Sequence, residues 1–98
     1  MPKLLAVIRS RGSGWAEAGP LEQQVDWRLH ADFMNGLHAA GFVLLGGPLE
    51  GTADVLLIVR AESEDAIAAR LAEDCWSRDG LLRISRTAPW QLRLGALG

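Results

Sequence analysis

Residues 30–48 read HADFMNGLHAAGFVLLGGP, and this stretch contains the change from helix to strand that decides the fold. Gly41 is a typical C-terminal stop for a helix, and the apolar residues Phe42–Leu45 behind it predict a short strand. Gly46-Gly47-Pro48 predicts the start of a turn. On the N-terminal side the helix is predicted to reach back to Leu21, because apolar residues recur at helical spacing as Val25, Leu29, Phe33, Leu37 and Ala40.

The segments around this stretch predict a βαββαβ order with one more strand at the C-terminus. A second helix is expected to begin after an N-cap at Ser63 and to end near Glu73, and residues 10–20 predict a loop. Strands are expected at Lys3–Arg9, Ala53–Val59, Leu81–Thr87 and Trp90–Leu94. This order predicts a single α+β domain over residues 1–98, ferredoxin-like, with an antiparallel sheet and an extra C-terminal strand.

The first and third strands lie at the centre of the sheet in that arrangement. Both segments, LLAVI at residues 4–8 and DVLLIV at residues 54–59, are apolar on both faces, whereas the helices cover only one face. Large exposed apolar patches mark interaction surfaces, and symmetric dimers are the commonest assembly. The sequence therefore predicts a homodimer in which a second copy of the sheet covers the open face.

The composition excludes several classes of protein. The net charge is −2, so the chain lacks the excess of positive charge that binding to nucleic acid or to an anionic membrane requires. No apolar run reaches the ~20 residues of a membrane helix. The single cysteine, Cys75, excludes an internal disulfide and is typical of a reducing compartment, so the expected location is the cytoplasm.

A series of short motifs is specific when their order and spacing are taken together. They are LLAVIRSRG at residues 4–12, Trp15, His30-x-x-Phe33-Met34, Gly41-Phe42 leading into Gly46-Gly47-Pro48, Asp74-x-Trp76 followed by Gly80-Leu81, and Pro89-Trp90. In these motifs the chain resembles the YCII-related family of the dimeric α/β-barrel superfamily. The resemblance implies a ferredoxin-like subunit, a homodimer with facing sheets, and a pocket with a His–Asp pair at His30 and Asp74. This chain has Cys75 where members of that family usually have proline.

His30 and Asp74 are accordingly the candidate catalytic residues. The helical stripe places His30 at the edge of the apolar face, where a side chain contacts both core and pocket, although a structural histidine also fits there. Asp74 is expected at the C-terminal end of the second helix. The helix dipole disfavours an acid at that end, so Asp74 needs a cationic partner, solvent or a function.

The candidate substrate-binding residues are Arg9, Trp15, Gly47, Pro48 and Trp76. Arg9 is suited to binding a carboxylate, the two tryptophans to walling an apolar pocket, and the Gly-Pro turn to close approach of a ligand. Each residue also has a purely structural interpretation, as a solvated cation, as interface packing or as a turn. No metal, haem or other cofactor is predicted, because no Cys/His cluster accompanies His30. Cys75 is not predicted to be a nucleophile, because a single cysteine without a surrounding motif is weak evidence for one.

The function predicted from these residues is cofactor-independent proton transfer on a small organic molecule, of the isomerase or lyase type. His30 would act as general acid or base, and Asp74 would orient and stabilise it. The alternative is a non-catalytic module of the same fold that binds a small ligand or a partner. RNA binding by the same βαββαβ order is rejected, because the two central strands carry no aromatic residue on which bases stack.

Overall fold

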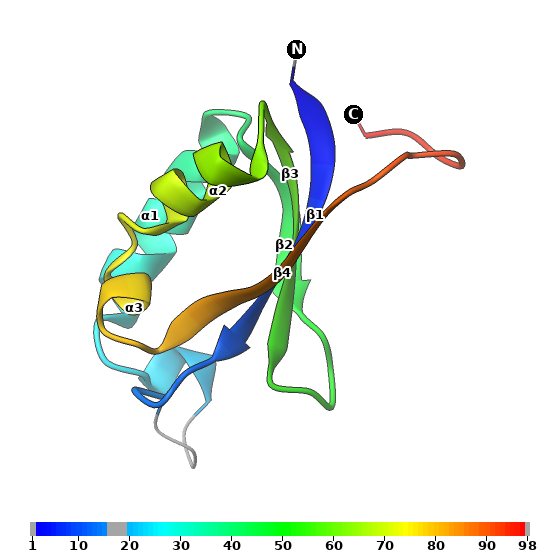
Figure 1. Ribbon diagram of the computed structural model, residues 1–98. Coiled ribbons are helices and arrows are strands. Elements are labelled where there is room, and N and C mark those ends of the chain that lie inside the picture. Colours follow the sequence, from blue (N-terminus) through cyan, green and yellow to red (C-terminus); the bar gives the residue numbers. More distant parts are fainter. Residues whose placement is uncertain (1, 16–19, 98) are drawn as a thin grey trace.

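A computed structural model describes residues 2–15 and 20–97 of the chain. Four strands form one antiparallel sheet in the order β2-β3-β1-β4, and the helices all lie on one of its faces (Figure 1). This confirms the predicted α+β fold with β1 and β3 at the centre. The elements are β1 (Lys3–Arg11), the 3₁₀ turn η1 (Leu21–Gln23), α1 (Trp27–Ala39), β2 (Val43–Pro48), β3 (Asp54–Ala61), α2 (Glu64–Leu71), α3 (Cys75–Arg78) and β4 (Leu82–Pro89).

An aliphatic core joins the sheet to α1 and α2. It consists of Leu5, Val7, Leu37, Val43, Leu57, Val59, Ala61, Ile67 and Leu71. Side chains alternate between the two faces of a strand, so the residues of β1 and β3 that belong to this core point toward the helices. Their neighbours Ala6, Ile8 and Leu56 point to the opposite face. No helix covers that opposite face in the part of the chain that the structure describes (Figure 1).

The first helix is shorter than predicted and turned about its axis. It begins at Trp27, because Asp26 has a left-handed backbone with φ of 58° that separates α1 from η1. Val25 and Leu29, which the predicted stripe placed in the core, are each 61% exposed. The buried residues of α1 are His30 and Leu37. His30 therefore lies on the buried face of the helix and not at its edge.

The segment Gly46-Gly47-Pro48 belongs to β2 and does not start the turn, which lies at residues 49–53. Gly46 packs closely against the neighbouring strand, because a Cβ atom there would lie 2.7 Å from Cδ2 of Leu57. A larger residue would therefore require the side chain of Leu57 to move.

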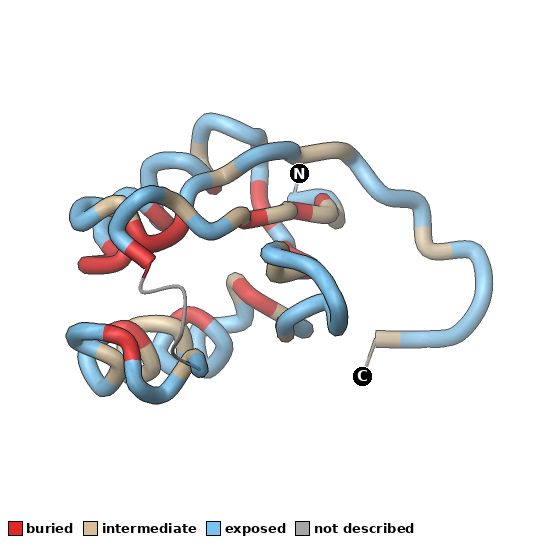
Figure 2. The backbone as a smooth tube through the Cα atoms, turned by 90° about the horizontal axis from the view of Figure 1, so that it is seen from below, coloured by how far each residue is buried: buried red, intermediate tan, exposed pale blue. Residues whose placement is uncertain are grey.

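The predicted fifth strand over Trp90–Leu94 is not formed. β4 runs to Pro89, and the backbone N–H of Trp90 still donates to the carbonyl of Leu4 at 2.9 Å. Beyond that bond the chain leaves the sheet, and residues 91–97 are exposed or half-buried (Figure 2). A strand needs a neighbour to pair with, and the described chain offers none beyond Lys3, where β1 begins. Among the described residues, no helix is both long enough and apolar enough to cross a membrane.

Candidate active site

Arg9 is the one basic residue among the fully buried side chains of the described chain, with 1% of its surface exposed. Leu5, Val7 and Arg9 alternate along β1 and are all buried, so Arg9 points toward the helices, as the alternation of a strand requires. The pairing of β1 with β4 shifts register between Ile8 and Arg9, and such bulges often adjust the direction of a side chain beside a functional site. The end of β1 therefore brings a cation beneath α1 and α3.

Asp74 lies at the N-terminus of a helix and not at the C-terminal end of one, as the sequence had suggested. α2 ends at Leu71, and Asp74 is the extended N-cap of the short α3. Its Oδ1 atom accepts a hydrogen bond from the backbone N–H of Trp76 at 3.2 Å. An acid is favourable at this end of a helix, so the dipole argument no longer requires a partner for Asp74. It has partners nonetheless.

A buried ionic cluster forms where β1, α1 and α3 meet. Oδ2 of Asp74 lies 2.8 Å from Nδ1 of His30 and 3.1 Å from Nη1 of Arg9. Nη2 of Arg9 donates to the hydroxyl of Ser77 at 2.7 Å. Asp74 is fully buried and His30 is 8% exposed. Because a buried charge is tolerated only when it is paired and hydrogen-bonded, the three residues form one electrostatic unit.

The directions in which the pKa values of Asp74 and Arg9 are shifted follow from this packing. Burial by itself would raise the pKa of the Asp74 carboxyl. The hydrogen bond from His30 and the positive charges of His30 and Arg9 outweigh burial, so the pKa lies below its ordinary value. Burial lowers the pKa of the Arg9 guanidinium from its ordinary value, and Asp74 opposes that change. Asp74 is thus a carboxylate at neutral pH, and the cluster holds an ion pair.

The geometry fixes which nitrogen of His30 is available for chemistry. A carboxylate only accepts hydrogen bonds, so Nδ1 of His30 carries the proton in its bond to Asp74. In the neutral ring Nε2 then holds the lone pair. The ring stacks on Trp76 with centroids 3.8 Å apart and an interplanar angle of 7°, which fixes its orientation.

Trp76 and Trp15 lie behind His30 and do not line the cavity described below, contrary to the walls predicted from the sequence. With Cys75, Leu81 and Leu82 they form a second buried group, here called the tryptophan cluster. Nε1 of Trp76 donates to the carbonyl of Val25 at 2.6 Å, and Trp15 packs edge-on against Trp76 at 5.4 Å. Trp76 is fully buried and so supports the ring of His30.

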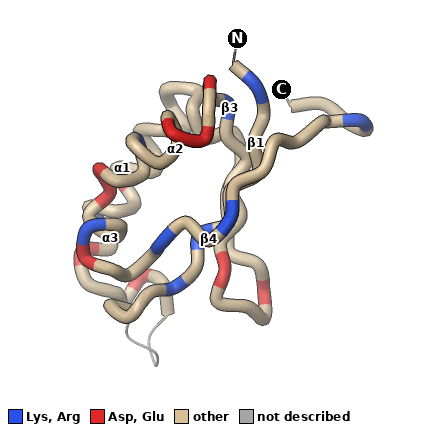
Figure 3. The backbone as a smooth tube through the Cα atoms, in the orientation of Figure 1, with Lys and Arg blue, Asp and Glu red and all other residues tan. Residues whose placement is uncertain are grey.

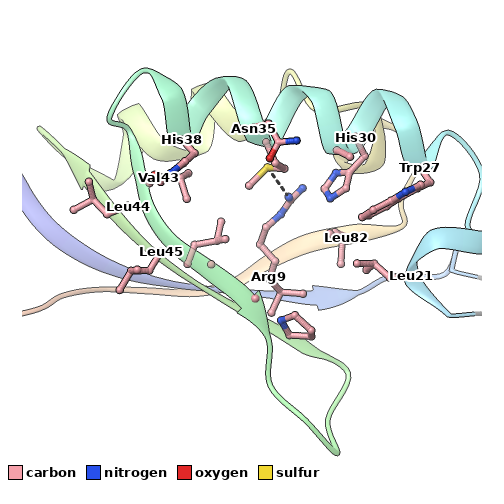
Figure 4. Close-up of a pocket in the computed structure, with 17 residues that line it drawn as sticks. Arg9, Leu21, Trp27, His30, Asn35, His38, Val43, Leu44, Leu45 and Leu82 are labelled. Atoms are coloured by element: carbon pink, nitrogen blue, oxygen red, sulfur yellow. Dashed lines mark hydrogen bonds between the residues drawn. The ribbon is translucent and has the colours of Figure 1, made fainter. Parts of the chain in front are cut away.

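A cavity of about 530 Å³ opens between α1 and the sheet in front of His30 (Figure 4). Volumes of 300–1,000 Å³ are typical of small-molecule sites. Its upper wall is α1 and its lower wall is β2 with parts of β3 and β1. Four of the residues predicted from the sequence line it, namely Arg9, His30, Gly47 and Pro48. The other lining residues are Leu21, Trp27, Ala31, Met34, Asn35, His38, Val43, Leu44, Leu45, Gly46, Val55, Leu57 and Leu82.

Two polar neighbours of the candidate site, Ser77 and His38, were missed by reasoning from the sequence. Ser77 completes the surroundings of Arg9, and it lies three residues after Asp74 within the turn of α3. His38 lines the cavity about two helical turns after His30. The signal for His38 was its i,i+8 spacing from His30 in the sequence. The signal that Arg9 is buried was its alternation with Leu5 and Val7 along the strand.

Cys75 has no environment that would activate it as a nucleophile. It is buried, and burial together with the negative charge of Asp74 raises the pKa of its thiol. Residues 2–15 and 20–97 contain no group of three or more His, Cys, Asp or Glu placed to hold a metal ion. The expectation that the protein works without a cofactor stays a prediction.

No protein-family model matches this chain, and no curated protein matches it. Among solved structures the chain is similar to 5-chloro-2-hydroxyhydroquinone dehydrochlorinase from Burkholderia phenoliruptrix AC1100, in its complex with 2,5-dihydroxybenzoquinone. The TM-score is 0.59 at 23% sequence identity, and the alignment covers 93% of this chain and 95% of the other. This similarity extends over nearly the whole length of both chains and shows a shared fold.

Proposed function

We propose that this protein is a small cytoplasmic enzyme that moves protons on a small organic molecule without a cofactor, as an isomerase or a lyase of the elimination type. The observation that supports this function best is the 2.8 Å hydrogen bond from Nδ1 of His30 to the buried carboxylate of Asp74. That bond leaves Nε2 of His30 as the base on a ring that lines the cavity. The single cysteine, a free thiol, supports a reducing location.

In the proposed reaction, Nε2 of His30 takes a proton from a hydroxyl or an activated carbon of the substrate. Asp74 accepts the Nδ1–H bond throughout and stabilises the imidazolium that results. The imidazolium then returns the proton to another atom of the substrate, which completes an isomerisation. For an elimination from a halogenated hydroxyarene, the proton goes to the ring carbon that bears the halogen. Nε2 of His30, free again after this transfer, takes a second hydroxyl proton as the carbon–halogen bond breaks and the halide leaves. The products are a quinone and HX, and no redox reagent is consumed.

Arg9 is proposed to assist by holding Asp74 and by offering charge to an anionic substrate oxygen. Its Nε atom is buried without a hydrogen-bond partner, while Nη1 and Nη2 contact Asp74 and Ser77. An unpaired buried donor is costly, and Arg9 lines the cavity. A phenolate or enolate oxygen near Nε would satisfy this donor and be stabilised as it forms. Gly47 and Pro48 are proposed to contact the substrate from β2.

The similarity to a dehydrochlorinase supports the choice of elimination chemistry, because that enzyme's name describes a lyase-type reaction on a hydroxylated ring. The test measures chloride release from 5-chloro-2-hydroxyhydroquinone and deuterium incorporation into 2-hydroxyhydroquinone in heavy water. We expect His30→Gln to lower the rate of whichever reaction the wild type catalyses by about 10²–10⁴-fold. The exposed acid Asp32 provides the control, and Asp32→Asn should retain full activity.

Asp74→Asn should also lower the rate, but it should cost little more in a protein that already carries His30→Gln, because the two residues act as a unit. Equal rates for wild type and His30→Gln would contradict the proposal. So would the absence of both reactions in the wild type. Binding without either reaction would instead support a ligand-binding module of the same fold.

The homodimer is the second part of the proposal, and it rests on the open face of the sheet. Ile8 and Leu56 pair across β1 and β3 and point away from the helices, and the helices leave this face uncovered (Figure 1). Light scattering should give twice the mass of 10.6 kDa. Leu56→Glu should shift the mass to that of one chain, whereas Ala68→Glu on the exposed side of α2 should not. A wild type that stays monomeric at micromolar concentration would refute the dimer.

A further inference from the structure

His38 gives the cavity a second polar end. Side chains four residues apart lie one above the other on a helix, and α1 presents two such rows to the cavity. One row is His30, Met34 and His38, and the other is Trp27, Ala31 and Asn35; all six residues line the cavity (Figure 4). The eight residues from His30 to His38 correspond to about 12 Å of helix. The two histidines therefore lie at opposite ends of one wall.

The tautomer of His38 follows from its hydrogen bond. Nδ1 of His38 lies 2.9 Å from the carbonyl oxygen of Val43 on β2. A carbonyl only accepts hydrogen bonds, so Nδ1 is protonated, and in the neutral ring Nε2 is an acceptor. This bond also ties the last turn of α1 to β2, which is a sufficient structural role for Nδ1. It leaves Nε2 of this exposed, cavity-lining ring without a hydrogen-bond partner in the described chain.

Both histidines therefore use Nδ1 to hold their position in the protein and keep an Nε2 lone pair for a ligand. Between them the lining is mostly apolar, with Met34 on α1 and Val43, Val55 and Leu57 on the strands opposite. Its polar groups there are Asn35 and the guanidinium of Arg9, which contacts Met34. An apolar stretch of this kind suits the faces and edges of a ring, and acceptors at its ends suit hydrogen-bond donors. The cavity is complementary to a flat molecule with a donor at each end.

We propose that the cavity binds a hydroxylated six-membered ring lengthwise, with one hydroxyl at His30 and the opposite hydroxyl donating to Nε2 of His38. A six-membered ring with hydroxyls at opposite positions carries one donor at each end, which matches two acceptors at opposite ends of one wall. His38 is thus a specificity-determining residue at the end remote from the chemistry. The inference rests on the proposed function only in assigning the reacting end to His30.

The test compares two probes by isothermal titration calorimetry in anaerobic buffer. Hydroquinone has two donor hydroxyls, and 4-methoxyphenol has one of them replaced by a methyl ether. The wild type should prefer hydroquinone by about five- to ten-fold, the effect of one hydrogen bond. His38→Ala should abolish this preference by weakening hydroquinone binding alone, with 4-methoxyphenol changed less than about two-fold.

A second variant separates the loss of an acceptor from damage to the fold. His38→Gln has an amide oxygen that accepts a hydrogen bond, so it should retain part of the preference. The inference is overturned if the wild type does not prefer hydroquinone, or if His38→Ala shows the same preference as the wild type. Either result counts even if chloride release depends on His30. If chloride release fails while the preference still depends on His38, the substrate class stands and the proposed chemistry does not.

Discussion

The aliphatic core and the tryptophan cluster are both buried against the same face of the sheet, but they are built from different chemistry. The aliphatic core contains only apolar side chains. The tryptophan cluster packs beside three buried residues that carry or share charge, Arg9, His30 and Asp74. Burial of apolar surface stabilises a fold without needing any partner, whereas a buried ion pair contributes little net stability and is costly to break. The first region holds the fold together, and the second holds the ring of His30 in position.

The largest expected losses of stability are those of Leu5→Ala and Arg9→Ala, two substitutions on the same strand that represent the two regions. Both side chains point toward the helices, and they are 0% and 1% exposed. Leu5→Ala should cost about 2–5 kcal/mol of unfolding free energy at any pH, because it leaves a cavity. Arg9→Ala should cost about 3–5 kcal/mol at neutral pH, because it leaves the carboxylate of Asp74 without its cation.

The losses of unfolding free energy caused by Leu5→Ala and Arg9→Ala should differ in their dependence on pH. Protonation of Asp74 removes the charge that Arg9 neutralises, so the cost of Arg9→Ala should shrink below about pH 4. Urea unfolding followed by circular dichroism at neutral and acidic pH measures both. If the two variants show the same pH dependence, the electrostatic account of the second region is wrong.

Asp74→Asn sharpens the comparison by removing the charge while keeping the shape. Asparagine is a good N-cap, so α3 should remain, and the loss should be about 2–3 kcal/mol at neutral pH from weaker bonds to His30 and Arg9. The folded pKa of Asp74 is lowered, so its stabilisation is complete above the unfolded pKa of about 3.9 and is lost as pH falls through the folded pKa.

The difference in unfolding free energy between wild type and Asp74→Asn should therefore be constant from neutral pH down to about pH 4 and should decrease below it. The exposed pair Arg28–Asp32 is a matched control. Asp32→Asn should change stability by less than about 0.5 kcal/mol. A difference that grows as the pH falls would contradict the assigned direction of the pKa shift.

Ser77→Ala gives the smallest effect. It removes the hydroxyl that accepts a hydrogen bond from Nη2 of Arg9 at 2.7 Å, and we expect a loss of about 1–2 kcal/mol. Ser77→Thr keeps the hydroxyl and should recover most of the stability. The same urea titration measures both variants. A neutral Ser77→Ala would mean that water replaces the hydroxyl, and that the cluster around Arg9 is less closed than its burial indicates.

The fold was predictable because it depends on periodicity. Apolar residues on both faces of residues 4–8 and 54–59 identified the central strands. The orientation of α1 was not predictable, because the left-handed backbone at Asp26 starts the helix late and turns Val25 and Leu29 to solvent. Helix periodicity cannot show such a break, because it follows only the spacing of apolar residues.

The candidate site was predicted in part. The pairing of His30 with Asp74 was expected from the resemblance, and the two side chains lie 2.8 Å apart. The helix around Asp74 was misjudged, because the segment Ala72–Trp76 contains neither glycine nor proline to mark the end of α2. Arg9 was expected to meet solvent or a substrate, and its partner in the protein is an acid from a distant part of the chain. Long-range pairs of this kind leave no local signal. By contrast, Arg83 and Arg86 on β4 are exposed, and Figure 3 marks the positions of basic residues along this strand.

The stacking of His30 on Trp76 gives the protein an optical probe of the protonation of that imidazole ring. The two rings are 3.8 Å apart and nearly parallel, and a protonated imidazole at that distance quenches the emission of an indole. The light emitted by Trp76 should therefore dim whenever His30 holds an extra proton. A rapid-mixing fluorescence trace, with His30→Phe as the reference, would then follow the movement of a single proton in real time and without a label.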